Sequence, residues 1–242
     1  VAQVIGLTAL ADWLIVDGVV RNSLFVVVFM LLTIFIISAG VKEGIEKWAT
    51  RLMPSLVLIL VLLIVYVFTL PGAMEGLRAY LVPDFSVFAR PGLLVSAMGQ
   101  AFFSLSLGVG TMLVYGSYIS KSENLPVIGS LVALLDVGIA VLAGLLILPA
   151  MYVALASGVE IFDAQGGLIA GPGLIISVLP ALFDSMGAVG GFVAFAFFAL
   201  MAIASLTSSI SMLEVPVSFV VESKGVRRPA AAFLLGSIIA SI

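Results

Sequence analysis

The chain has 242 residues, of which 63% are hydrophobic and only 10% charged. Its mean hydropathy is +1.35, which excludes a water-soluble globular domain, because such domains carry about a quarter charged residues. A net charge of −3 says little about orientation, and the lack of cysteine and histidine excludes disulfides, thiolate chemistry and the commonest catalytic base.

The N-terminal segment, residues 1–22, is semi-polar and contains Asp12 and Asp17, which favours a loop or interfacial segment. The rest contains apolar runs long enough for spanning helices, each of which needs roughly 20 residues. We predict an all-α membrane protein with one transmembrane domain over 1–242 and six spans, at about 23–40, 53–70, 93–119, 126–154, 188–221 and 230–242. The chain starts without methionine and stops inside an apolar run, so we expect an incomplete domain.

The basic residues set the expected orientation, because short cytoplasmic loops are enriched in lysine and arginine. Of ten basic residues, seven lie in alternate connections, and three lie in the others (Arg21, Arg78, Arg90). We expect the first group to be cytoplasmic: Lys42, Lys47, Arg51, Lys121, Lys224, Arg227 and Arg228. The outer connections are then 71–92 and 155–187, and the second is too apolar for a plain loop. It fits short helices dipping toward the membrane or an interfacial amphipathic piece equally well.

The stretch "QAFFSLSLGVG", residues 100–110, interrupts the run 93–119 with serine and glycine. Glycine costs about 1 kcal/mol relative to alanine inside a helix, so the helix would unwind here most easily. Unwound backbone is tolerated in a bilayer only where it is buried or lines a cavity, and its free carbonyls can bind cations. Close helix packing by small residues is the structural alternative.

Two further features break the apolar pattern. Asp136 lies about ten residues into its span, where a carboxylate marks an ion or substrate path or a hydrogen bond that fixes packing. Thr207, Ser208, Ser211 and Glu214 recur at three- and four-residue spacings in "ASLTSSISMLE" and form a polar stripe. Hydroxyl and carbonyl oxygens suit a hard cation such as Na⁺, although such hydroxyls also bond to their own helix carbonyls.

Together, a breakable helix, a lone acid and a hydroxyl stripe on separate spans are typical of a transporter site at mid-membrane. A proton-driven transporter using Glu214 and a non-transporting scaffold remain as alternatives. An intramembrane protease is disfavoured, since the serine type usually needs histidine and the aspartyl type needs two aspartates.

Long, ordered motifs resemble the neurotransmitter:sodium symporter family, especially its bacterial amino-acid transporters. They are "GVKEGIEKWATRLMP", "VPDF", "GQAFFSLSLGVGTMLVYGSYISK" and "SLTSSISMLE", and the match runs from about residue 23 to the end. The resemblance implies a LeuT-like inverted-repeat helical bundle, of which this chain would supply the fourth to ninth helices. The run 93–119 would be the discontinuous sixth helix, and the first and third helices would be absent. This polypeptide alone is then not expected to transport.

The resemblance also implies functional residues. Phe103 would be the aromatic lid, with carbonyls near Phe103 and Ser104 and the Ser106 hydroxyl receiving the substrate amino group beside Gly108. Val109, Ser208 and Met212 would lie at the substrate side chain. Ser104 and Asp136 match the first sodium site; the Ala204 carbonyl with the Thr207 and Ser208 hydroxyls matches the second. Gln100 would lie at the outer gate, and Tyr118 and Glu222 at the cytoplasmic gate.

Two departures from the family pattern are informative. Asp136 stands where asparagine is common, and animal members need chloride nearby, so a fixed carboxylate predicts chloride-independent transport. Val109 replaces a bulky aromatic, which favours a larger substrate side chain. The expected function is Na⁺-coupled symport of an apolar or aromatic amino acid across the plasma membrane. The partners are the amino acid, two Na⁺ ions and the lipid bilayer, with no nucleic acid and no enzymatic activity.

Overall fold

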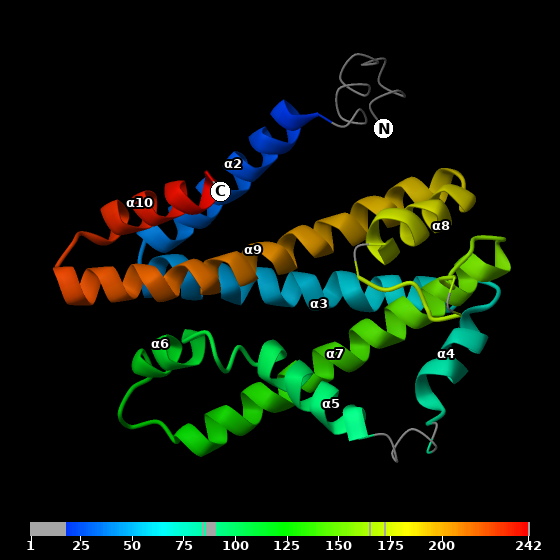
Figure 1. The fold of residues 1–242 in the computed structure, drawn as a ribbon, viewed down its shortest axis with the longest axis horizontal. Coiled ribbons are helices and arrows are strands. Elements are labelled where there is room, and N and C mark those ends of the chain that lie inside the picture. Colours follow the sequence, from blue (N-terminus) through cyan, green and yellow to red (C-terminus); the bar gives the residue numbers. More distant parts are fainter. Residues whose placement is uncertain (1–17, 84, 86–90, 165, 172, 242) are drawn as a thin grey trace. The chain divides into compact units, whose positions relative to one another are not determined.

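The computed structural model describes residues 18–83, 85, 91–164, 166–171 and 173–241, which are mostly helical (Figure 1). The chain divides into two compact units. One is Val1–Met53 with Ile203–Ile242, and the other is Pro54–Ala202. Most of the segment expected to be interfacial, residues 1–22, lies outside the described residues.

The first unit is built from three long helical segments and two shorter ones: α2 (Val19–Ser38), η1 (Val41–Glu46), the start of α3 (Lys47–Val67), the end of α9 (Ala188–Lys224) and α10 (Arg228–Ala240). Helix α10 packs on α2, with Ile37 and Ala231 fully buried. A Cβ at Gly236 would lie only 2.5 Å from Ile34 Cδ1, so a larger residue here would require the Ile34 side chain to shift.

The connection expected at 41–52 is helical instead. The π-helical turn η1 leads directly into α3, and Lys47 Nζ lies 3.1 Å from Glu43 Oε2 on an exposed face. Hydropathy predicts where a chain leaves lipid, whereas a helix continues past that point when its charged residues stay exposed and pair at i,i+4. Helix α2 likewise begins at Val19, within the segment expected to be interfacial.

The second unit contains the discontinuous helix. Its elements are the rest of α3, α4 (Ala73–Leu81), α5 (Pro91–Ser104), α6 (Thr111–Ser117), α7 (Leu125–Ala156), η3 (Leu174–Val178), α8 (Leu179–Ser185) and the start of α9. Helix α7 begins after Asn124, whose Oδ1 accepts from the Val127 N–H at 3.3 Å, with Pro126 in its first turn. The α7 helix also contains an internal proline, Pro149.

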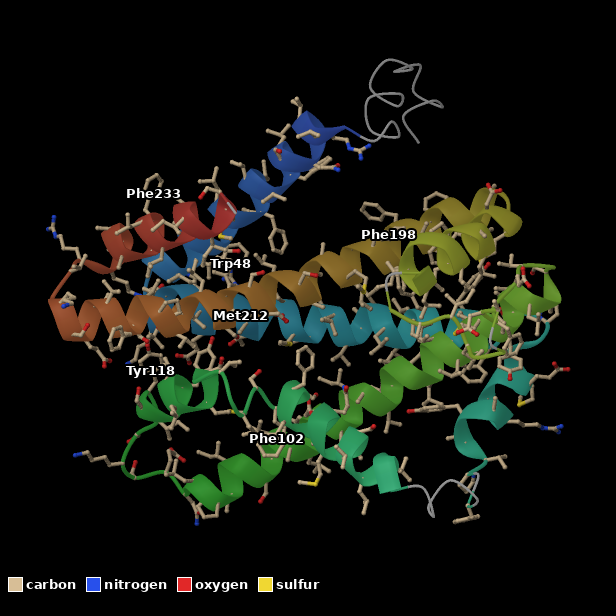
Figure 2. All side chains as sticks on the ribbon, in the orientation of Figure 1. Trp48, Phe102, Tyr118, Phe198, Met212 and Phe233 are labelled. Carbon is tan, nitrogen blue, oxygen red and sulfur yellow. The ribbon has the colours of Figure 1, made fainter. Side chains whose placement is uncertain are left out.

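An apolar core joins α7, α8 and α9 in this unit. Leu179 and Leu182 of α8 are almost fully buried. The Phe183 ring lies 5.6 Å from that of Phe197 and 6.3 Å from that of Phe198, and Figure 2 shows Phe198 beside α8. The outer connection 155–187 therefore contains the short helices η3 and α8, while their relation to a membrane stays a prediction.

Four helices of the described chain are long and apolar enough to cross a membrane: Val19–Ser38, Val41–Val67, Leu125–Ala156 and Ala188–Lys224. Gly92–Ser104 and Arg228–Ala240 are shorter apolar helices. The first of these shorter helices ends where the predicted span 93–119 is interrupted.

Candidate ion and substrate site

The predicted break in the span 93–119 is confirmed. Helix α5 ends at Ser104 and α6 begins at Thr111. The Leu107 N–H donates to the Phe102 carbonyl at 3.0 Å, and the Ser106 N–H donates to the Phe103 carbonyl at 3.1 Å. This pair of bonds is a Schellman motif, which closes a helix and turns the chain away from its axis.

Ser106 occupies the left-handed position of that motif, with φ of 53°. It is the single non-glycine residue with positive φ in the part of the chain that the structure describes. Glycine usually fills this position, because a Cβ there costs roughly 1–2 kcal/mol. A hydroxyl side chain has been placed where the backbone alone favours glycine, which marks Ser106 as a functional candidate. Gly110, with φ of 83°, then starts α6.

The unwound segment leaves backbone oxygens available. Across the described residues, no hydrogen bond uses the carbonyl oxygens of Leu105 to Val109. A Cβ at Gly108 would meet no atom within 4 Å, so the backbone there is openly accessible. Free carbonyls next to a helix break are suitable ligands for a cation or an ammonium group.

The end of α5 is tied to α7 by a polar contact. The Ser104 hydroxyl donates to Asp136 Oδ1 at 2.7 Å. Two residues that the resemblance assigned to one sodium site, 32 positions apart, are therefore neighbours. Asp136 Oδ2 accepts no hydrogen bond from any described residue. The described ranges contain no group of three or more Asp, Glu, His or Cys side chains that could hold a metal ion. One carboxylate together with neutral oxygens is a set of ligands that suits Na⁺.

The polar stripe lies on α9 in the first unit. The Thr207 hydroxyl donates to the Ala204 carbonyl at 2.9 Å, and the Ser211 hydroxyl donates to the Thr207 carbonyl at 3.1 Å. Thr207 and Ser211 thus bond to their own helix, as the structural alternative predicted. The same contact brings the Ala204 and Thr207 oxygens together, and the neighbouring Ser208 is exposed.

The remaining predicted residues are accessible. Phe103 is 83% exposed, Val109 59% and Met212 67%, and Gln100 and Glu222 are also exposed. The Tyr118 ring meets Tyr115 edge to face at 6.3 Å. Figure 2 labels Tyr118 and Met212 on their respective units. The roles that the resemblance assigns to these side chains stay predictions.

The structure adds a partner that sequence reasoning missed. Glu214 is completely buried and pairs with Arg228, whose Nε also donates to the Ile37 carbonyl at 2.9 Å. The ion pair joins α9 to the start of α10, and the second bond reaches the end of α2. The sequence indicated that Glu214 lies deep within a predicted span, and a carboxylate there needs a positively charged partner. The local sequence does not show which of the basic residues is that partner.

Comparison with known proteins decides the family. The profile described as the sodium:neurotransmitter symporter family matches residues 6–240. The chain belongs to this family. Its members are symporters, not enzymes. Discontinuous helices near the substrate and ion sites are known in transporters of the LeuT-like fold.

Individual relatives agree with that assignment. YhdH of Bacillus subtilis, named as an uncharacterised sodium-dependent transporter, is 35% identical over 230 residues, covering 93% of this chain and 47% of YhdH. The Drosophila melanogaster sodium-dependent serotonin transporter is 32% identical over 206 residues, covering 83% and 32% of the two chains. The crystal structure of MhsT in complex with L-phenylalanine superposes with a TM-score of 0.72 at 42% identity, covering 88% of this chain and 46% of MhsT. The chain spans about half the length of the bacterial relatives it matches. The solved structure supports the LeuT-like fold.

Proposed function

We propose that this chain is part of a longer protein, the intact transporter. The intact transporter couples Na⁺ entry to uptake of an amino acid. The observation that carries the proposal is the contact of Ser104 with Asp136 at 2.7 Å, next to the unwound residues 105–110. This contact places the Asp136 carboxylate and the Ser104 hydroxyl next to the free backbone carbonyls of the unwound segment. These are the groups that a cation and a zwitterionic solute need.

Two ion sites follow from the oxygen ligands. Ser104 and Asp136 contribute to the first, and the Ala204 carbonyl with the Thr207 and Ser208 hydroxyls contributes to the second. In the second, an arriving Na⁺ would turn the Thr207 proton away from Ala204, so that both oxygens face the ion. The remaining ligands of both sites would come from parts of the intact transporter outside this chain.

The proposed substrate is an apolar or aromatic amino acid. Its amino group would meet the carbonyls around Phe103 and Ser104 and the Ser106 hydroxyl, close to Gly108. Val109, Ser208 and Met212 would line the side-chain end, and Phe103 would cover it. The L-phenylalanine complex of MhsT, 42% identical to this chain, supports this substrate class.

Asp136 is the basis for proposing that transport does not need chloride. A bound Na⁺ in a low-dielectric site requires a nearby negative charge. The Asp136 carboxylate, which accepts a hydrogen bond from the Ser104 hydroxyl at 2.7 Å, would supply that charge, so a chloride ion would not be needed for charge balance. The proposed location is the plasma membrane.

The proposed mechanism is alternating access. Na⁺ would stabilise the unwound segment and so favour substrate binding, and each ligand would raise the affinity for the other by the same factor. Gln100 would lie at the outer gate, and Tyr118 and Glu222 at the cytoplasmic gate. The loaded protein would then rock between outward-open and inward-open states.

Glu214 does not support the proton-driven alternative. A proton carrier has to gain and lose its charge in each cycle. Glu214 is completely buried and forms an ion pair with the Arg228 guanidinium, so it has no surface through which to exchange a proton with solvent. We assign this pair a structural role.

A thermal-shift screen of the intact transporter against the twenty amino acids tests the function. The screen is run once in Na⁺ and once in choline at equal ionic strength. We expect apolar or aromatic amino acids to raise the melting temperature in Na⁺ only. Equal stabilisation in choline would reject sodium coupling, and no stabilisation by any amino acid would reject the substrate class.

A further inference from the structure

The helix α4 is held on α7 by a close contact between Tyr80 and Gly144. Figure 1 shows α4 beside the C-terminal half of α7. A Cβ built on Gly144 would lie 2.6 Å from Tyr80 Cε2 and even closer to the ring carbon that bears the hydroxyl. The tyrosine ring therefore fills the space that any larger residue at Gly144 would occupy. The Tyr80 hydroxyl also donates to the Val141 carbonyl at 3.4 Å.

A second close approach lies farther along α7. A Cβ on Gly76 would lie 2.6 Å from Pro149 Cα and 2.7 Å from the Leu148 carbonyl oxygen. The two helices thus meet backbone to backbone at Gly76 and side chain to backbone at Tyr80. These two close approaches show that α4 packs tightly against α7 at both points.

The contacts lie on both sides of a weak point in α7. Pro149 has no N–H to donate to the Leu145 carbonyl, and its ring crowds that carbonyl, so a helix bends most easily there. Tyr80 contacts α7 before this point, and Gly76 contacts it at the proline itself. Beyond the proline, a Cβ on Gly72, the residue that precedes α4, would lie 2.8 Å from the Tyr152 carbonyl oxygen. Helix α4 therefore packs against α7 along the turn that contains Pro149 and supports the helix there.

Helix α7 also carries Asp136. Asp136 and Gly144 are eight positions apart, which corresponds to about 12 Å along a helix axis. Helix α5, whose last residue Ser104 contacts Asp136, follows α4 in the chain. Helices α4 and α5 therefore each contact α7, α4 through Tyr80 at Gly144 and α5 through Ser104 at Asp136.

We propose that Tyr80 is a positioning residue for the sodium site at Asp136. By holding α7 straight and fixing where α4 lies along it, Tyr80 sets the distance between Asp136 and the end of α5. The residue itself would not touch the ion. This inference rests on the proposed sodium site, and it adds a residue that acts on this site from two helical turns away.

The test measures Na⁺-induced thermal stabilisation of the intact transporter, with Na⁺ as the only added ligand. The variants are Tyr80→Ala, Tyr80→Phe and Gly144→Ala. The matched control is Gly129→Ala, the same substitution in α7 at a position with no described atom within 4 Å of the new Cβ. The melting temperature without Na⁺ is recorded separately, so that loss of stability is not mistaken for loss of ion binding.

We expect Tyr80→Ala and Gly144→Ala to raise the Na⁺ concentration for half-maximal stabilisation roughly two- to thirtyfold, the usual range for coupling through packed residues. Tyr80→Phe keeps the ring and should stay close to the unsubstituted protein, as should Gly129→Ala. An unchanged Na⁺ midpoint in Tyr80→Ala would overturn the inference, even if the melting temperature without Na⁺ fell.

A double-mutant cycle with Ser104→Ala tests the route of the effect. If Tyr80 acts by aligning Ser104 with Asp136, Tyr80→Ala should shift the Na⁺ midpoint less in the Ser104→Ala background. Full additivity would contradict the proposed route. An unsubstituted transporter that Na⁺ does not stabilise would reject the proposed function, an outcome that is distinct from failure of the Tyr80 inference.

Discussion

Arg228 donates to both Glu214 and the Ile37 carbonyl, so one guanidinium at the start of α10 joins the interior of α9 to the end of α2. Glu214 has no exposed surface, and the Arg228 side chain is 19% exposed. A buried pair of this kind contributes little net stability, because both charges lose hydration, but removing one partner leaves an uncompensated charge. The first unit therefore depends on the pair being complete.

We predict that Arg228→Ala destabilises the intact transporter by about 3–5 kcal/mol, the usual cost of breaking a buried ion pair. The double variant Glu214→Leu with Arg228→Met should recover most of that loss. Thermal unfolding measures both. A double variant as unstable as Arg228→Ala would show that the pair does more than neutralise buried charge.

The same residues separate sodium coupling from proton coupling. Glu214→Gln in the Arg228→Met background removes the titratable group together with its partner. If Glu214 does not carry protons, Na⁺-dependent uptake should persist with an unchanged pH profile. Loss of pH-dependent uptake in this variant would restore the proton-driven alternative.

The helix break was predictable from local sequence, and the contacts that surround it were not. The serine and glycine residues at 104–110 located the helix break correctly, because helix propensity is a local property. The left-handed Ser106 was not foreseen, since hydropathy and spacing carry no information on φ. Tyr80 and Arg228 were also missed as supporting residues, because their partners lie 61 and 191 positions away in the chain, at Val141 and Ile37.

Substitutions at Ser106 test whether its hydroxyl binds the substrate, which would explain a non-glycine residue with positive φ at the helix break. Ser106→Gly should raise the melting temperature of the unliganded protein, because glycine relieves the left-handed conformation. It should also weaken amino-acid binding roughly two- to tenfold, the range expected when one neutral hydrogen bond is lost. Ser106→Ala is the control, with the same loss of binding and no gain in stability. Unaltered binding in both variants would remove the hydroxyl from the substrate site.

The second ion site is tested on α9. Thr207→Ala combined with Ser208→Ala should raise the Na⁺ concentration needed for half-maximal amino-acid binding, since two proposed oxygen ligands are lost. Ser211→Ala is the matched control on the same stripe, because its hydroxyl bonds back to the Thr207 carbonyl. Equal Na⁺ titrations in the double variant and the control would exclude the hydroxyls from ion binding.

Chloride independence is tested by uptake into vesicles with chloride replaced by gluconate. We expect the same rate in both anions, because the Asp136 carboxylate already balances the sodium charge. Asp136→Asn removes that charge and should make uptake faster in chloride than in gluconate. A sharp fall for the unsubstituted transporter in gluconate would contradict the charge argument.

The most direct test of the account is a Na⁺ titration of L-phenylalanine binding to the purified intact transporter, comparing Asp136→Ala with Asp163→Ala. Asp163 lies in the connection after α7, where its Oδ1 accepts from the Gly167 N–H at 2.8 Å, so its loss should leave the titration unchanged. We predict that Asp136→Ala shifts the Na⁺ midpoint upward by at least about tenfold, as expected when a charged ligand is removed. Identical midpoints for Asp136→Ala and the unsubstituted protein would contradict the claim that this carboxylate and the unwound backbone beside it hold the ion.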